Sequence, residues 1–161
     1  MGRKKVLLEA KLRTRILNNT INWNDDDNYK QNLSEEFILR FQDQLNWTHV
    51  CKFQKLSDNV IRQCQDKLNW FHTCYYGQLS ETIIREFQDN IDWYWISSKQ
   101  ELSEEFIIEF EDRVNWYLIS INQKLSREFI LKHIDKLNTN NILWCQKLDQ
   151  ETRDYLVLLK G

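Results

Sequence analysis

Proline and glycine are nearly missing from this sequence. The 161-residue chain has no proline, and its three glycines are Gly2, Gly77 and Gly161. Both residues are typical of the turns of β architectures, and glycine also builds phosphate-binding loops. Average usage is about 5% for proline and 7% for glycine, so turn-rich β folds and glycine-rich phosphate sites lose most of their support. The composition favours helices joined by short links.

Long hydrophobic segments are also missing. No run of 18 apolar residues occurs, and the basic start of the chain is followed by only three apolar residues before Glu9. A membrane span needs about 20 apolar residues, and a signal peptide has an apolar region of about 7 to 15. The sequence therefore predicts a soluble intracellular protein that is not secreted and does not engage a membrane.

Cysteine is too sparse for a disulfide scaffold, and no Cys-x-x-Cys pair occurs. Secreted domains that depend on disulfides have closely spaced cysteines. We therefore expect free thiols in a reducing compartment. The four residues are Cys51, Cys64, Cys74 and Cys145.

The chain also has no large excess of charge of either sign, because it contains 22 basic and 24 acidic residues. The net charge of −2 gives no protein-wide field for nucleic acid or acidic lipid. Only residues 1–32 are basic, with seven basic and four acidic side chains, whereas residues 33–124 carry nine and fifteen. Hydrophobic residues at 42% and aromatic residues at 13% nevertheless allow a folded core.

A repeat of 23 residues is the strongest signal that is present. Leucine-serine pairs recur without insertion at Leu33, Leu56, Leu79, Leu102 and Leu125. After these five full repeats, Leu148 begins a truncated repeat, and Trp23 belongs to a degenerate repeat that precedes them. Fixed periods of this length are typical of solenoids built from short supersecondary units.

Each unit predicts two short helices. Ser34 is a good N-cap for a first helix over residues 35–45, and Asn46 caps a second helix over residues 47–54. Helices this short are not stable in isolation, so they must pack against their neighbours.

The predicted fold is therefore an all-α solenoid of paired short antiparallel helices. Residues 1–32 are expected to form a basic segment with a degenerate capping repeat. Residues 33–147 form five tandem repeats, and residues 148–161 form a truncated capping helix.

The consensus resembles the tandem repeats of uncharacterised proteins from large nucleo-cytoplasmic DNA viruses. Residues 102–124 show it as Leu-Ser-Glu-Glu-Phe-Ile, Phe-x-Asp, Asn-Trp, Ile-Ser and Gln-Lys, and the match covers residues 33–147. The repeat that begins at Leu56 departs from this consensus at Gly77, where the other full repeats have glutamine. The resemblance implies a helical array of a viral protein, in the host cytoplasm or the virion, and brings no catalytic residues.

Two columns of the repeat suggest a structural ladder. One is the aspartate column Asp43, Asp66, Asp89, Asp112 and Asp135. The other is the tryptophan column Trp47, Trp70, Trp93 and Trp116. A carboxylate near a helix C-terminus opposes the helix dipole, so its recurrence needs a reason. We expect each aspartate to lean inward and accept from an indole or from the start of the second helix.

Catalytic and metal-binding patterns have little support. The pairs His49–Cys51 and His72–Cys74 have i, i+2 spacing, which does not face two ligands toward one another on a helix. The cysteine column continues as serine in the next units, which favours a position that needs a small side chain. Without a nucleophile motif or phosphate loop, the sequence predicts neither an enzyme nor a cofactor or metal site.

Aromatic residues gather on the outer face of the second helices in the middle units. The candidate partner-binding residues are Phe71, Tyr75, Tyr94, Trp95, Tyr117, Leu118 and Ile121. Such a strip is either a second buried layer or a binding face, because large exposed apolar patches are uncommon and aromatic residues dominate interface anchors.

The leading hypothesis is a non-enzymatic interaction or scaffold module that binds a protein partner or itself. The alternative is single-stranded nucleic-acid binding, in which bases stack on the aromatic strip. The phosphates would then contact the basic N-terminus, at Arg3, Lys4, Lys5, Lys11, Arg13 and Arg15.

Overall fold

The computed structural model describes residues 2–18, 20–30 and 32–158, with all side chains in these ranges except those of residues 2–6 and 8. Within them the chain is all-α, as predicted, with twelve α-helices, two short 3-10 helices and no strand. The α-helices are α1 (Gly2–Leu17), α2 (Glu35–Arg40), α3 (Trp47–Phe53), α4 (Asp58–Gln63), α5 (Trp70–Tyr76), α6 (Glu81–Glu86), α7 (Trp93–Lys99), α8 (Glu104–Glu109), α9 (Trp116–Asn122), α10 (Arg127–Lys132), α11 (Thr139–Cys145) and α12 (Gln150–Leu158). The 3-10 helices are η1 (Asp26–Asn28) and η2 (Gln65–Lys67).

The chain divides into two compact units, unit 1 over Met1–Asn90 and unit 2 over Ile91–Gly161. None of the described helices combines the length and the apolar character that a membrane span requires. Asp25 caps η1, since its carboxylate accepts from the N–H of Asp27.

The helices from α2 to α11 begin at the predicted caps. Serine caps the first helix of each repeat, at Ser34, Ser57, Ser80, Ser103 and Ser126. Asparagine or aspartate caps the second, at Asn46, Asn69, Asp92, Asn115 and Asn138. Each side-chain oxygen accepts from a backbone N–H two or three residues later, which satisfies a donor that the helix itself leaves unpaired.

The first helices are shorter than the sequence predicts. Helix α2 ends at Arg40, five residues earlier than expected. A continuing helix would join the N–H of Asn46 to the carbonyl of Gln42. Instead, Asn46 donates to the hydroxyl of Tyr29 at 2.9 Å, and the indole of Trp47 donates to the Gln42 carbonyl at 2.8 Å. The helix therefore ends in a turn, in which the N–H groups of Gln44 and Leu45 both donate to Phe41 O, and does not continue to Asn46.

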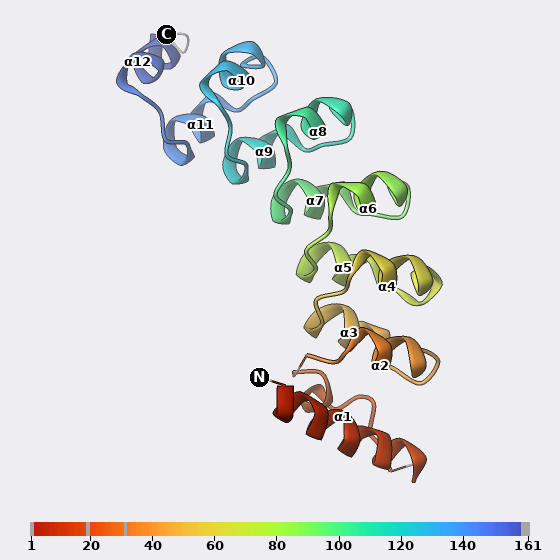
Figure 1. Ribbon diagram of the computed structural model, residues 1–161. Helices are drawn as coiled ribbons and strands as arrows, with labels where there is room; N and C mark the ends of the chain where they lie inside the picture. Colours follow the sequence, from red (N-terminus) through yellow and green to blue (C-terminus); the bar gives the residue numbers. More distant parts are fainter. Residues whose placement is uncertain (1, 19, 31, 159–161) are drawn as a thin grey trace. The chain divides into compact units, whose positions relative to one another are not determined.

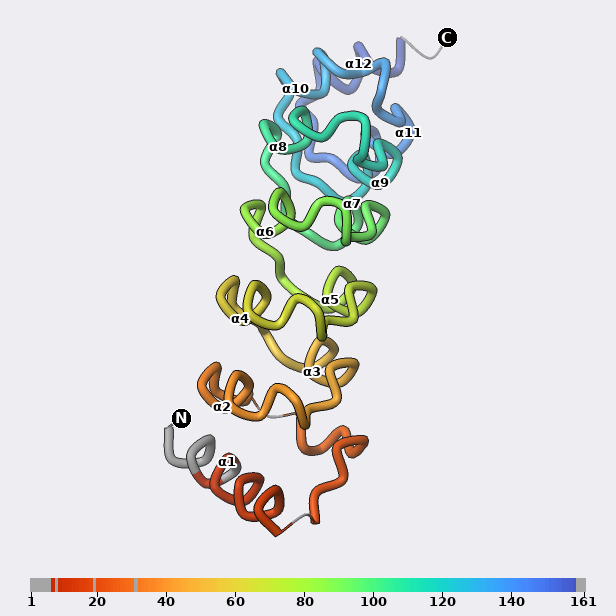
Figure 2. The backbone as a smooth tube through the Cα atoms, turned by 90° about the vertical axis from the view of Figure 1, so that its right-hand side faces the viewer, coloured from red at the N-terminus to blue at the C-terminus, as the bar shows by residue number. Residues whose placement is uncertain are grey.

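The core of unit 1 lies between a row of first helices and a row of second helices. Figure 2 shows α2 and α4 in one row and α3 and α5 in the other. Phe37 and Val50 are fully buried between the rows. Leu12 of α1 and Tyr29 belong to the same core, so the degenerate N-terminal residues cover its end.

Unit 2 repeats this arrangement. The second helices α7, α9 and α11 pack side by side (Figure 1), and Ile96, Ile119 and Ile142 on their inner faces are fully buried. The first helices α8 and α10 contribute the buried Phe106 and Ile130. The inner faces of both rows are therefore occupied, and any available surface lies on their outer faces.

Candidate functional site

Glutamines at the ends of second helices tie successive repeats together. Gln123 accepts from the N–H of Leu102 at 3.0 Å and donates to the carbonyl oxygens of Ser97 and Gln100 at 3.3 and 2.8 Å. Gln146 makes the equivalent bonds one repeat later, and Gln54 accepts from Leu33 at 2.8 Å. Gln54 and Gln123 are buried, so each carboxamide satisfies backbone groups that water cannot reach. We call this contact the glutamine bracket.

The cysteine and serine column provides acceptors as well as small side chains. The hydroxyl of Ser97 donates to Trp93 O at 2.7 Å and accepts from the N–H of Asn115 at 2.9 Å. Ser120 repeats both bonds, with Asn138 as the donor. Burial raises the pKa of the Cys51 thiol, and this keeps the sulfur neutral at the equivalent position.

The aspartate column does not form the inward ladder that the sequence predicts. All five side chains are exposed, those of Asp43, Asp66, Asp89, Asp112 and Asp135. Asp43 pairs with the ammonium of Lys67 at 2.7 Å. The indole of Trp116 donates to the backbone oxygen of Glu111 at 3.0 Å, as Trp47 does to Gln42. The indoles therefore bond to backbone oxygens and not to the aspartates. The starts of the second helices, which the aspartates were expected to meet, already have side-chain caps.

Exposed rings lie on the outer face of the second helices of unit 2. Tyr94 on α7 and Tyr117 on α9 occupy equivalent positions and are 50% and 56% exposed. Trp144 on α11 is 87% exposed and lies one helical turn further along the same face. Ile121 is half-buried on this face. We call these four residues the ring face.

Other predicted members of the strip are less accessible. Trp95 is half-buried with its ring edge-on to Tyr94 at 4.8 Å. Leu118 is only 9% exposed and therefore lies in the core rather than on the ring face. Helical geometry explains this, because Leu118 follows Tyr117 by 100° of rotation and turns toward the core.

Unit 1 carries a smaller set of rings on α5. Phe71 is 51% exposed, and Tyr75, one turn later, is half-buried. Their rings stack at 6.1 Å with an interplanar angle of 8°. Tyr75 also meets Tyr76 edge-on at 4.6 Å. The sequence positions of Phe71 and Tyr94 are equivalent, so both units place an exposed ring in the first turn of a second helix.

Two of the six basic residues proposed as phosphate contacts bond to other side chains of the protein. The side chains of Arg3, Lys4 and Lys5 lie outside the described residues. Arg13 lies 3.8 Å from the carboxylate of Glu36, and Arg15 donates to the side chain of Asn28 at 3.2 Å. Lys11 is exposed. The structure therefore turns two of the predicted phosphate contacts toward protein acceptors.

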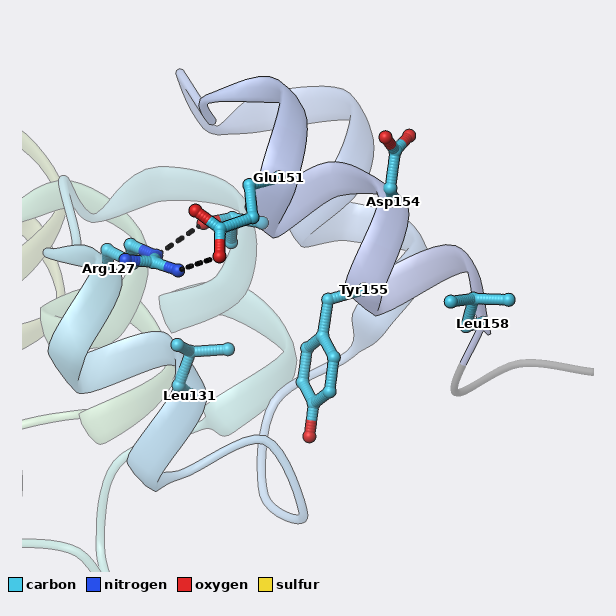
Figure 3. Close-up of a pocket in the computed structure, with 7 residues that line it drawn as sticks. Arg127, Leu131, Glu151, Asp154, Tyr155 and Leu158 are labelled. Atoms are coloured by element: carbon cyan, nitrogen blue, oxygen red, sulfur yellow. Dashed lines mark hydrogen bonds and ion pairs between the residues drawn. The ribbon is translucent and has the colours of Figure 1, made fainter.

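Grooves separate neighbouring first helices in unit 2. The one between α10 and α12 has a volume of about 440 Å³ (Figure 3). On its polar side, Arg127 donates to the hydroxyl of Thr152 at 2.7 Å and lies 3.4 Å from Glu151. Leu131, Tyr155 and Leu158 form its apolar side. Arg127 and Glu151 in this groove are paired with one another, which is typical of a structural contact.

The candidate metal pairs are held in structural contacts. His49 lies 2.9 Å from Asp26, and its ring stacks on Tyr29 at 5.3 Å. Cys51 and Cys74 are buried. In the part of the chain that the structure describes, no three histidine, cysteine or acidic side chains converge on one point.

Sequence reasoning missed two features of the surface and the core. Trp144 shares its column with Tyr75 and Ile121, and this alignment could have placed it on the ring face. The glutamine column was visible as a repeat, but only tertiary geometry reveals the backbone groups that it serves. Comparisons with protein-family models, curated proteins and solved structures find no match for this chain.

Proposed function

We propose that this protein is a non-enzymatic α-solenoid of 23-residue repeats that binds a protein partner through the ring face. The observation that carries the proposal is the exposure of Tyr94, Tyr117 and Trp144 on one face of three helices that pack side by side. Tyrosine and tryptophan are enriched at interface hot spots because they bury a large area with few rotatable bonds.

The chemistry of the described side chains supports binding over catalysis. The polar side chains that converge in the core hold backbone groups, as Gln123 and Ser120 do. An exposed tyrosine provides both an apolar ring and a hydroxyl that donates or accepts. We further propose an intracellular site of action, because the four cysteines are free thiols.

Site-specific photo-crosslinking tests the proposal. A benzophenone amino acid placed at Tyr117 should form a discrete cross-linked protein band in a lysate of the cells that make the protein. The same group at the exposed Asp112, outside the ring face, is the matched control. Equal labelling from both positions, or none from Tyr117, would contradict the proposal.

The same experiment separates the two hypotheses from the sequence. A cross-linked species that disappears after nuclease treatment would favour single-stranded nucleic acid. A species that is sensitive to protease and resistant to nuclease favours a protein partner. If its mass is twice that of the chain, the partner is a second copy.

A further inference from the structure

Gly77 interrupts the glutamine bracket in unit 1. It ends α5, at the position that Gln54 occupies at the end of α3. In the other described brackets, the carboxamide accepts from a leucine N–H and donates to backbone carbonyls of the preceding repeat. A glycine has no side chain with which to make these bonds.

The backbone groups that a glutamine at this position would serve are identifiable. The donor is the N–H of half-buried Leu56, which has no hydrogen-bond partner in the described part of the chain. The carbonyl groups of Cys51 and Gln54 occupy the positions that Ser97 and Gln100 have in the bracket of Gln123. By the equivalence of the repeats, one donor and two carbonyl groups border this site.

Space lies next to these groups. A cavity of about 10 Å³ is lined by Cys51, Gln54, Leu56 and Gly77, among others. It shares Gln54, Gly77 and Gln78 with an outer groove of about 300 Å³. We call the inner cavity together with this groove the Gly77 notch. The groove has room for a side-chain stem. The inner cavity has about the volume of one water molecule, so a single oxygen or nitrogen atom at the end of that stem can approach Leu56.

The walls of the groove are polar and basic. Lys52 and Lys55 line it together with the half-exposed ring of Tyr76 and the amide of Gln78. Both lysines are exposed, and no carboxylate is among the lining residues. A guest with neutral or negative flanking groups is therefore favoured over a cationic one.

We propose that the Gly77 notch binds the primary carboxamide of a glutamine side chain from another polypeptide. A primary carboxamide has an acceptor and two donors in a fixed fork, which matches one N–H beside two carbonyl oxygens. A carboxylate cannot donate to the carbonyls, and an ammonium cannot accept from Leu56. The notch and the ring face lie in different units, so this inference does not depend on the proposed function.

The first test is an NMR titration of the full chain with N-acetyl-glutamine methylamide. Saturable shifts are expected at the amides of Leu56 and Gly77. The glutamate analogue at pH 7 should bind at least about tenfold more weakly, because it leaves the carbonyls without a donor. Equal affinity for both compounds, or no shift at Leu56, would overturn the proposal.

Two variants make the test independent of any one substitution. Gly77→Gln should abolish the shifts by supplying the carboxamide from within the chain. A Cβ at residue 77 would lie 2.4 Å from Thr73 O, so the end of α5 must shift to accept it. Gln123→Gly avoids that difficulty, because it should create a second notch at which the probe shifts the amide of Leu102. Absence of this second site would count against the carboxamide mechanism.

Other occupants give distinct outcomes. Gln78 stands where other repeats have Lys55 or Lys124, and its own carboxamide lines the notch. If Gln78→Lys lowers the melting temperature and the variant gains no affinity for the probe, the notch is filled from within the chain and the proposal fails. Tighter binding of uridine monophosphate than of the glutamine probe would assign the notch to nucleic acid instead.

Discussion

At the scale of single residues, side chains complete the backbone of neighbouring repeats. Gln123 joins Leu102, 21 residues earlier in the chain, and Ser120 accepts from Asn138, 18 residues later. These bonds are formed where short helices end and begin, and there the backbone lacks internal partners. Leaving a buried amide without such a partner lowers the free energy of unfolding by about 1 to 3 kcal/mol.

We predict that Gln123→Ala lowers the free energy of unfolding by about 1 to 3 kcal/mol. The alanine leaves the N–H of Leu102 buried without an acceptor. Urea denaturation followed by circular dichroism measures the effect. Lys124→Ala, which changes the adjacent exposed residue, should be neutral within about 0.5 kcal/mol. Equal effects of the two substitutions would show that the bracket does not stabilise the fold.

At the scale of helices, one cap often bonds to two elements. Ser80 accepts from the N–H of Ile83 at 3.2 Å and donates to Asp58 of α4 at 2.7 Å. Ser126 accepts from Phe129 and bonds to Glu104 of α8 in the same way. The acid in the first turn of one first helix therefore bonds to the cap of the next. This pairing gives helices of six residues a stability that they lack in isolation.

Ser80→Ala is expected to cost about 1 kcal/mol of stability, since the N-cap bond to Ile83 is lost. Chemical denaturation of the full chain provides the measurement. Ser80→Thr keeps the hydroxyl and should retain most of the stability, because threonine is also a good N-cap. A threonine variant as unstable as the alanine variant would indicate a packing effect rather than capping.

The contacts of Glu35 between α2 and the start of α4 make the stability of the fold depend on pH. Hydrogen bonds from Asn59 and Ser57 hold the pKa of the Glu35 carboxyl below its ordinary value. Glu35 therefore stabilises the fold above the ordinary pKa of a glutamate, about 4.3, and this contribution is lost as the pH falls through the lower, folded-state pKa.

The substitution Glu35→Gln tests the sign of this dependence. The variant should be less stable than the parent at pH 7, and the difference should shrink on acidification. Thermal unfolding between pH 7 and pH 3 measures both. Glu36→Gln provides the control, since Glu36 lies beside it in the first turn of α2. A difference for Glu35 that stays constant with pH would contradict the assignment.

At the scale of the whole molecule, core and surface use aromatic residues differently. Trp93 and Trp116 are half-buried. Their ring centroids lie 5.0 Å from that of Phe110, the C-cap of α8, and 6.4 Å from that of Phe129 of α10. The rings of Tyr94 and Tyr117, one residue later in each helix, are about half exposed. The tryptophan column therefore packs against core residues, and the adjacent tyrosine column lies at the surface. Mutation can separate these two roles.

We predict that the double variant Tyr94→Ser, Tyr117→Ser abolishes the cross-link formed from the Trp144 position while its melting temperature stays within a few degrees of the parent. Half-exposed rings contribute little to the core, whereas Trp116→Ala should cost about 3 kcal/mol. Differential scanning calorimetry and photo-crosslinking provide the two readouts. Tyr155→Ser, at an exposed ring on α12, is the control that should leave the cross-link intact.

Dilution adds a check on self-association. If the ring face joins two copies, the melting temperature of the parent should fall on dilution, and that of the double variant should not. A large loss of stability in the double variant at every concentration would place these rings in the core and contradict the binding face.

Local chemistry made the helices predictable from the sequence. Ser34 and Asn46 cap the helices that they were predicted to cap, because an N-cap depends on residues within one turn. The early end of α2 was not predictable, since it depends on Tyr29, which lies 17 residues before Asn46. The ring face was predictable as a strip of columns, but the burial of Leu118 and the partners of Gln123 required the tertiary structure.

The glutamine bracket has a direction that matters while the chain is being synthesised. Leu33 and Leu102 each depend on a carboxamide that the ribosome adds 21 residues later. A nascent repeat therefore cannot close its backbone hydrogen bonds until the second helix of its own copy has left the exit tunnel. We expect arrest-peptide measurements on a growing chain to show pulling force in steps 23 residues apart, and Gln123→Ala to weaken the step that Gln123 completes while sparing the step before it.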